Sequence, residues 1–263
     1  MRIGFRRLKV LKRAKKAEKE AKRRDKRKIL RIPSGVPGFD KLAEGGLLSE
    51  SVNLVVGGAG SGKTIFAFQF LIQGAKRGEP GIYVTFEEKK DRIYHDLGEL
   101  GWDLEELEKK KKIAIIEYTP EQVKKMLEEG GGEIEALIER MKAKRIVIDS
   151  ITSFALLFES ELERREASLA LFELLRGWNT TAILTLEQEM TEERAAEHIA
   201  SALEFEADSI ILLYFFRPDG SRIRAVEILK MRGTNHSRAM NRFEISKGGI
   251  KIKGITHLGP RRR

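Results

Sequence analysis

The chain has 263 residues, of which 34% are charged, a formal net charge of +10 and no cysteine. That length suits one α/β domain with a buried core, and the lack of cysteine excludes disulfides and cysteine-ligated metals. No apolar run approaches the roughly 18 to 20 residues of a membrane span, and the N-terminus is mostly Lys and Arg, unlike a signal peptide. We therefore expect a cytoplasmic protein, and the abundance of Lys, Arg and Glu is typical of a thermophile.

The positive charge is concentrated at the two ends of the chain. Residues 1–28 contain fifteen Lys or Arg and three Asp or Glu, a net charge of +12, and residues 261–263 add +3. Residues 29–260 therefore carry a net charge of −5. We predict a basic N-terminal extension at 1–28, helical or disordered, an α/β domain at 29–257 and a basic tail at 258–263.

The basic extension permits several interpretations. Four apolar side chains recur at helical spacing and fall on one face: Met1, Phe5, Leu8 and Leu11. Residues 12–28 offer only alanines and charges, which cannot bury a core of their own. Nucleic acid, an anionic membrane and a protein partner are the candidate ligands. The alternative is a solvated extension with no specific ligand.

The domain begins with a turn-rich stretch at 29–46, which includes a short helix at 39–43. Behind it, strands alternate with helices and the chain ends in two hairpins. This order favours a mostly parallel sheet with helices on both faces and an antiparallel edge. Strands are expected at 52–56, 82–86, 113–118, 145–149, 182–186, 209–215, 223–231, 243–245 and 250–252. Helices are expected at 65–77, 90–100, 119–129, 134–141 and 160–177, and a polar loop at 190–198.

A glycine-rich motif lies between the first core strand and the first long helix. Its residues are Gly57, Gly58, Ala59, Gly60, Ser61, Gly62, Lys63 and Thr64, followed by Ile65. They match G-x-x-x-x-G-K-[ST] at every fixed position, in the strand–loop–helix context of a P-loop. Backbone N–H groups and the helix N-terminus of such a loop bind phosphate. We expect Lys63 to reach the β- and γ-phosphates and Thr64 to hold Mg²⁺; the alternative is an ordinary glycine-rich turn.

An acidic residue, Asp149, ends the mainly apolar strand that is expected to begin at Arg145. Beside a P-loop, such a strand end is a Walker B element, whose carboxylate helps to hold Mg²⁺. Without the P-loop, an acid that merely ends a strand would be the simpler interpretation. The sequence therefore predicts a site for a nucleoside triphosphate with its Mg²⁺.

Several further stretches are informative when they are taken together. They are residues 35–40, 83–88, 101–104, 147–150 and 229–237, beside the P-loop itself. With them the chain resembles the KaiC-like ATPases of the RecA superfamily, in a single-domain form of the archaeal type. The resemblance covers about residues 30–255 and implies a RecA-like fold and ATP as the nucleotide.

The resemblance also implies roles for residues outside the P-loop. It makes Glu87 and Glu88 the catalytic pair, of which at least one polarises the attacking water. It makes Lys230 and Arg232 cations that reach the γ-phosphate held by a neighbouring subunit. The protein would then work as a ring homo-oligomer, most simply a hexamer. The alternative for these four residues is ordinary surface charge.

The chain departs from the clock proteins of this family in two ways. Those proteins have two such domains, whereas one P-loop is present here, and residues 204–208, where they phosphorylate themselves, carry no hydroxyl. We therefore favour Mg-ATP hydrolysis in a regulatory or signalling protein and leave protein kinase activity open. A RecA/RadA-like DNA-dependent ATPase is one alternative, although the loop at 190–198 is acidic and would repel phosphate. An ATP-gated scaffold with little turnover is the other.

Overall fold

The computed structural model describes residues 30–119, 121–122, 125–126, 132–152, 158, 160–188, 202–219 and 221–255. From Arg31 onwards, the described residues form one compact unit. The basic extension, the basic tail and the loop at 190–198 lie outside the described residues, as does most of the helix expected at 119–129. The predictions made for them, and the predicted domain boundaries, stay predictions.

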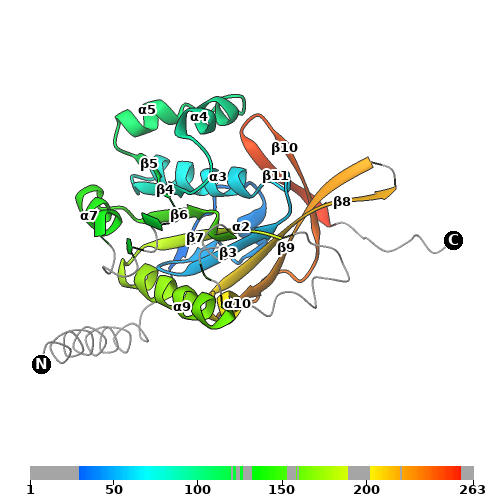
Figure 1. Cartoon of the computed structure of the whole chain (residues 1–263). Coiled ribbons are helices and arrows are strands. Elements are labelled where there is room, and N and C mark those ends of the chain that lie inside the picture. The colour runs from blue at the N-terminus through cyan, green and yellow to red at the C-terminus, as the bar shows by residue number, and fades with distance from the viewer. Residues whose placement is uncertain are drawn as a thin grey trace, which may run out of the picture. The chain divides into compact units, whose positions relative to one another are not determined.

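A twisted sheet forms the centre of the unit (Figure 1). Within the described residues it has nine strands in the order β11-β10-β9-β8-β3-β7-β6-β4-β5. Neighbours from β8 to β5 are parallel, and β8, β9, β10 and β11 pair antiparallel at the other end. This confirms the predicted mostly parallel α/β sheet with C-terminal antiparallel hairpins. The strands are β3 Val52–Gly57, β4 Gly81–Thr85, β5 Ile113–Glu117, β6 Arg145–Asp149, β7 Thr181–Glu187, β8 Ser209–Asp219, β9 Ser221–Met231, β10 Asn241–Ser246 and β11 Gly249–Ile255.

Helices cover both faces of the sheet. In Figure 1, α3, α4 and α5 lie on one side and α9 and α10 on the other. The helices are α2 Phe39–Leu42, α3 Lys63–Lys76, α4 Lys90–Gly98, α5 Leu104–Lys109, α7 Gly132–Met141, α9 Glu161–Gly177 and α10 Ala202–Glu206. A small separate sheet pairs β1 Arg31–Ile32 with β2 Leu47–Leu48. No helix in the described part of the chain is long and apolar enough to cross a membrane.

The central strand β3 shows why both faces need a cover. Val52, Leu54 and Val56 pack into one core cluster together with residues of α7 and α9. Val55 packs into the opposite cluster together with residues of α3, α4 and α5. Successive side chains of a strand point to opposite faces, so a continuous apolar run indicates a strand that is buried on both sides.

Local chemistry sets the helix ends. Ser160 caps α9 in the predicted capping box, because its side chain accepts from the Glu163 N–H while the Glu163 side chain accepts from the Ser160 N–H. The helix expected at 90–100 ends earlier, at Gly98. A further helix, α5, was not expected; Asp103 caps it by accepting from the Glu106 N–H at 2.9 Å.

Candidate nucleotide-binding site

The glycine-rich loop joins β3 to α3 in the middle of the sheet. Gly62 precedes α3 with φ of 102°, a left-handed conformation that glycine adopts without strain. A Cβ on Gly57 would lie 2.5 Å from the carbonyl oxygen of Leu213. The end of β3 can therefore approach β8 this closely only with glycine at position 57. The helix begins at Lys63, two residues before the expected start. The predicted strand–loop–helix arrangement is confirmed.

Two buried groups of the loop suit an anionic ligand. Lys63 is 9% exposed, and its Nζ donates to the Gly58 carbonyl at 3.0 Å. Burial lowers the pKa of Lys63, and nearby carboxylates, chiefly that of Glu187, act against this shift. The Ser61 hydroxyl is buried and has no hydrogen-bond partner within the described residues. A phosphate chain would supply an anion for the Lys63 ammonium and a hydrogen-bond acceptor for the Ser61 hydroxyl.

Asp149 lies beside the start of α3. Its carboxylate accepts hydrogen bonds from Thr64 Oγ1 at 2.8 Å, from Tyr83 OH at 2.6 Å and from Thr185 Oγ1. Burial and then the charge of Asp149 raise the pKa of Tyr83, which keeps its phenol protonated as a donor. Three hydroxyl donors from three elements therefore fix the carboxylate next to Thr64.

The oxygens of Thr64 and Asp149 fit a Mg²⁺ ion that is shared with a substrate. Mg²⁺ prefers oxygen ligands and is usually held by one or two protein groups together with phosphates and water. The described residues contain no cluster of three or more His, Cys, Asp or Glu that could hold a metal by itself. A Mg²⁺ ion at Thr64 and Asp149 would therefore take its remaining ligands from phosphates and water.

The two glutamates after β4 are not equivalent. Glu88 lines the pocket described below, whereas Glu87 does not. Thr85 fixes the main chain of Glu88, since its hydroxyl accepts from the Glu88 N–H at 3.0 Å and donates to the Glu88 carbonyl at 3.2 Å. Partial burial and then the charge of Asp149 raise the pKa of Glu88. Glu88 is therefore the better placed of the two to act on a ligand in the pocket.

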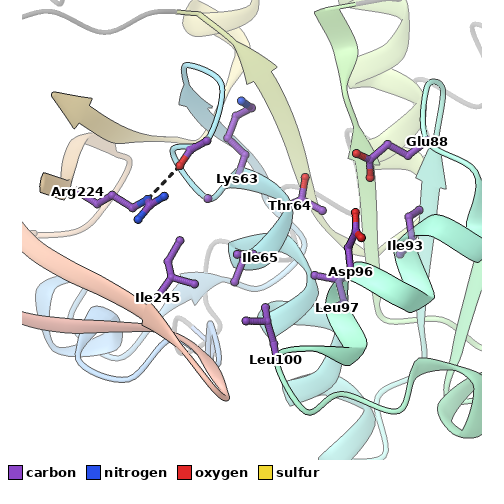
Figure 2. Close-up of a pocket in the computed structure, with 12 residues that line it drawn as sticks. Lys63, Thr64, Ile65, Glu88, Ile93, Asp96, Leu97, Leu100, Arg224 and Ile245 are labelled. Carbon is purple, nitrogen blue, oxygen red and sulfur yellow. Dashed lines mark hydrogen bonds between the residues drawn. The ribbon is translucent and has the colours of Figure 1, made fainter. Parts of the chain in front are cut away.

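A pocket of about 590 Å³ opens beside the loop (Figure 2). Its size is within the usual range for small-molecule sites. One part is polar and contains Lys63, Thr64, Glu88 and Asp96, and another is apolar. The apolar lining residues are Ile65, Ile93, Leu97, Leu100 and Ile245. A polar end for phosphates beside an apolar end suits a nucleotide.

Arg224 at the pocket's edge was missed by the sequence analysis. Its Nε donates to the Gly60 carbonyl at 3.0 Å, shown as the dashed line in Figure 2. Its guanidinium lies 4.3 Å from the centre of the Phe215 ring. The register of the hairpin pairs Phe215 with Arg224, and only the pairing of β8 with β3 brings both to the glycine loop. Neither pairing can be read from the local sequence.

Lys230 and Arg232 lie away from this pocket. Lys230 pairs with Ile210 near the start of β8, whereas the glycine loop follows the far end of β3, where Gly57 pairs with Leu213. The structure thus brings Lys63, Thr64, Asp149 and Glu88 together and separates the two cations from them.

Comparisons with known proteins agree with this geometry. A family model described as "ATPase: KaiC" matches residues 32–257. The circadian clock protein KaiC3 of Synechocystis is 35% identical over 232 residues, which are 85% of this chain and 46% of that protein. A UPF0273 protein of Aeropyrum pernix is 35% identical over 235 residues, 84% of this chain and 93% of that protein. The chain therefore spans about half the length of the clock protein and almost all of the UPF0273 protein.

A solved structure is similar over the whole fold. The crystal structure of a KaiC-like protein from the hyperthermophilic archaeon Pyrococcus horikoshii is 38% identical, with a TM-score of 0.75, and the match covers 86% of this chain and 100% of that one. The matched family model, these relatives and the P-loop pocket lead to one assignment. The chain belongs to the KaiC-like family of P-loop ATPases, with a RecA-type fold.

Proposed function

We propose that the protein hydrolyses Mg-ATP at a site that a neighbouring subunit completes, in a ring homo-oligomer that is a hexamer. The observation that carries the proposal is the separation described above. Lys63, Thr64, Asp149 and Glu88 converge on one pocket at the carboxyl ends of the parallel strands. Lys230 and Arg232 lie at the other end of these strands, beside the start of β8. Cations that cannot serve their own pocket can serve that of a neighbour. A site completed between subunits would make assembly depend on nucleotide, and this dependence suits a regulatory or signalling role.

Each residue has a role in the proposed reaction. The loop at 57–64 binds the phosphates through its N–H groups, and Lys63 neutralises charge on the β- and γ-phosphates. Bound Mg²⁺, held by Thr64 and Asp149, would neutralise further phosphate charge. Glu88, supported by Glu87, orients a water and takes its proton as the water oxygen bonds to the γ-phosphorus. The bond from that phosphorus to the bridging oxygen breaks, which leaves ADP and phosphate.

Lys230 and Arg232 of the next subunit act on the developing charge. A cation supplied by a second protein typically accelerates phosphoryl transfer by about 10³- to 10⁵-fold. Hydrolysis and assembly are then coupled, because a separate subunit has an incomplete site.

The first test measures assembly. Size-exclusion chromatography with light scattering is run with and without Mg-ATP on the wild type and on Lys230→Ala/Arg232→Ala. We expect a hexamer that Mg-ATP promotes and that the double substitution weakens. Lys109→Ala/Lys110→Ala is the matched control, since it removes two exposed cations of and next to α5 and should leave assembly unchanged. A monomer under every condition would refute the ring.

The second test assigns the cations to the neighbour. Arg232→Ala subunits, with an intact pocket, are mixed with Glu87→Gln/Glu88→Gln subunits, which have intact cations but no catalytic carboxylates. We expect each variant alone to be nearly inactive and the mixture to recover hydrolysis at mixed contacts. If mixing restores nothing although mixed rings form, the site is not shared. If the wild type assembles in response to ATP but hydrolyses almost none of it, the result would instead favour the alternative of an ATP-gated scaffold.

A further inference from the structure

The cation pair is held by the last turn of α10 and by Asp208, which directly precedes β8. Lys230 Nζ and Arg232 Nη2 both donate to the carbonyl of Phe205, at 3.3 and 2.7 Å. Arg232 Nη1 lies 3.4 Å from Asp208 Oδ1, and the Arg232 N–H donates to the Asp208 carbonyl at 2.8 Å. A guanidinium has five N–H donors, so Arg232 can be held by these bonds and still donate to a phosphate.

The carboxylate that holds Arg232 is itself fixed to the central strand. Asp208 Oδ2 accepts from the Val52 N–H at 2.9 Å, and the Asp208 N–H donates to the Val52 carbonyl at 2.8 Å. The Asp208 side chain is 20% exposed, against 49% for Arg232. The long, exposed side chain of Arg232 is thus bonded to the short side chain of Asp208, which is itself hydrogen-bonded to β3. Such an anchor lowers the conformational entropy that Arg232 loses when it binds a ligand.

Two residues that adjoin the cation pair carry exposed apolar side chains. Phe205 is 72% exposed and Leu229 is 42% exposed, and both adjoin the cation pair, one through its carbonyl and the other through the chain. Both side chains are therefore accessible to a second copy of the chain. The complementary charge in the pocket of a second copy would come from a bound triphosphate, because the charged lining residues Lys63, Arg224, Glu88 and Asp96 balance one another.

We propose that Asp208 is a positioning residue that holds Arg232 in the orientation in which it reaches the nucleotide of the neighbouring copy. The inference rests on the proposed shared site and adds a residue for which the resemblance implies no role. Asp208 acts through Arg232 and does not touch the substrate. Its loss should therefore lower kcat and leave the KM for ATP nearly unchanged, because each copy binds ATP with its own glycine loop.

Asp208→Asn separates the two contacts of this side chain. The amide oxygen can still accept from the Val52 N–H, whereas the negative charge that pairs with Arg232 is gone. We expect kcat to fall about 10- to 100-fold, as when groups that orient metal ligands are removed. Combining it with Arg232→Ala should lower kcat no further than Arg232→Ala alone.

Glu206→Gln is the matched control. It removes one carboxylate two residues away, and Glu206 pairs with Arg176 of α9 at 3.0 Å rather than with Arg232. Its kcat should stay within about twofold of the wild type. Thermal melting of all variants checks that the fold is retained. An unchanged kcat in Asp208→Asn, or an equal loss in Glu206→Gln, would overturn the inference.

A mixing experiment decides which copy Asp208 serves. Asp208→Asn subunits are mixed with Glu87→Gln/Glu88→Gln subunits, whose Asp208 and Arg232 are intact. We expect hydrolysis to recover, because an intact Arg232 then serves the pocket of the Asp208→Asn subunit. If this mixture stays inactive while the Arg232→Ala mixture recovers, Asp208 acts on its own pocket through β3, and only the inference is overturned. If neither mixture recovers, the shared site fails and the inference fails with it.

Discussion

The central sheet uses charge differently at the two ends of its parallel strands; we call the carboxyl ends the pocket edge and the amino ends the opposite edge. At the pocket edge, Lys63, Glu88 and Asp149 face one pocket or adjoin it. At the opposite edge, charge is either locked inside, as in the Arg145–Glu79 ion pair, or held at the surface, as in Arg232. The carboxyl ends of parallel strands are the usual position of α/β ligand sites. The comparison indicates that the first edge holds the candidate nucleotide site, whereas charge at the second edge either stabilises the fold or stays at the surface.

The largest expected effect separates the two glutamates at the pocket edge. Glu88→Gln should lower turnover by about 10²- to 10⁴-fold, the range for loss of general base catalysis, because Glu88 lines the pocket. Glu87→Gln should lower turnover less, since Glu87 is not part of the lining. Steady-state phosphate release measures both, and fluorescent ATP binding should be retained in both. A larger loss in Glu87→Gln would reverse the assignment of the base.

At the opposite edge, the buried ion pair should matter to stability and not to chemistry. Arg145 is fully buried and Glu79 is 23% exposed, with 2.6 Å between Nη2 and Oε2. Glu79→Ala leaves the buried guanidinium without its carboxylate and should lower the free energy of unfolding by about 3–5 kcal/mol. Urea unfolding measures this loss. Arg77→Ala, which removes only the exposed partner of Glu79, should cost less than about 1 kcal/mol.

The same pair gives the sign of a pH effect. Burial alone would raise the pKa of Glu79, but hydrogen bonds from Arg145 and Arg77 outweigh it and lower the pKa. The stabilisation is therefore present above the ordinary pKa of a glutamate and is lost as the pH falls through the lowered one. The difference in the free energy of unfolding between the wild type and Glu79→Ala should therefore become smaller only at acidic pH. A difference that stays constant down to that range would contradict the ion pair as its cause.

A smaller effect lies away from both edges, at the start of α9. Ser160→Ala removes a side-chain acceptor of the capping box and should lower the free energy of unfolding by about 1 kcal/mol. ATP turnover per folded molecule should be unchanged, because α9 covers the sheet and does not line the pocket. A change in turnover larger than the change in folded fraction would link α9 to the site.

Sequence analysis predicted the pocket edge better than the opposite edge, for a physical reason. The glycine loop is local: eight consecutive residues in a strand–loop–helix context are enough to identify a candidate phosphate site. The position of Asp149 could also be predicted, since it ends a strand of the same parallel sheet. Its bond to Tyr83 could not, because β4 meets β6 only through the sheet order.

The opposite edge depends on register between distant segments. Arg232 meets Asp208 across 24 positions of sequence, through the long β8–β9 hairpin. Asp208 in turn meets Val52 across 156 positions. Residues 204–208 could be interpreted from the sequence only by what they lack, a hydroxyl. Their contribution, a carbonyl and a carboxylate that hold two cations, arises from tertiary pairing.

The smallest expected effect concerns the pH dependence of turnover. Figure 2 shows Glu88 and Asp96 on the same side of the pocket. The pKa of Glu88 is raised by burial and then by Asp149, while the charge of Asp96 raises it further and that of Arg92 lowers it. Because a carboxylate must be ionised to take a proton, turnover should fall as the pH drops through this raised pKa.

Two substitutions should move that fall in opposite directions. Asp96→Asn removes a negative charge and should lower the pKa of Glu88, so that activity persists to lower pH. Arg92→Ala removes a positive charge and should move the loss of activity to higher pH. The pH profile of kcat, measured at low salt to limit screening, gives both shifts. Shifts of the same sign in both variants would mean that a group other than Glu88 limits turnover in acid, and the assignment of the base would have to move from Glu88 to another carboxylate at that edge.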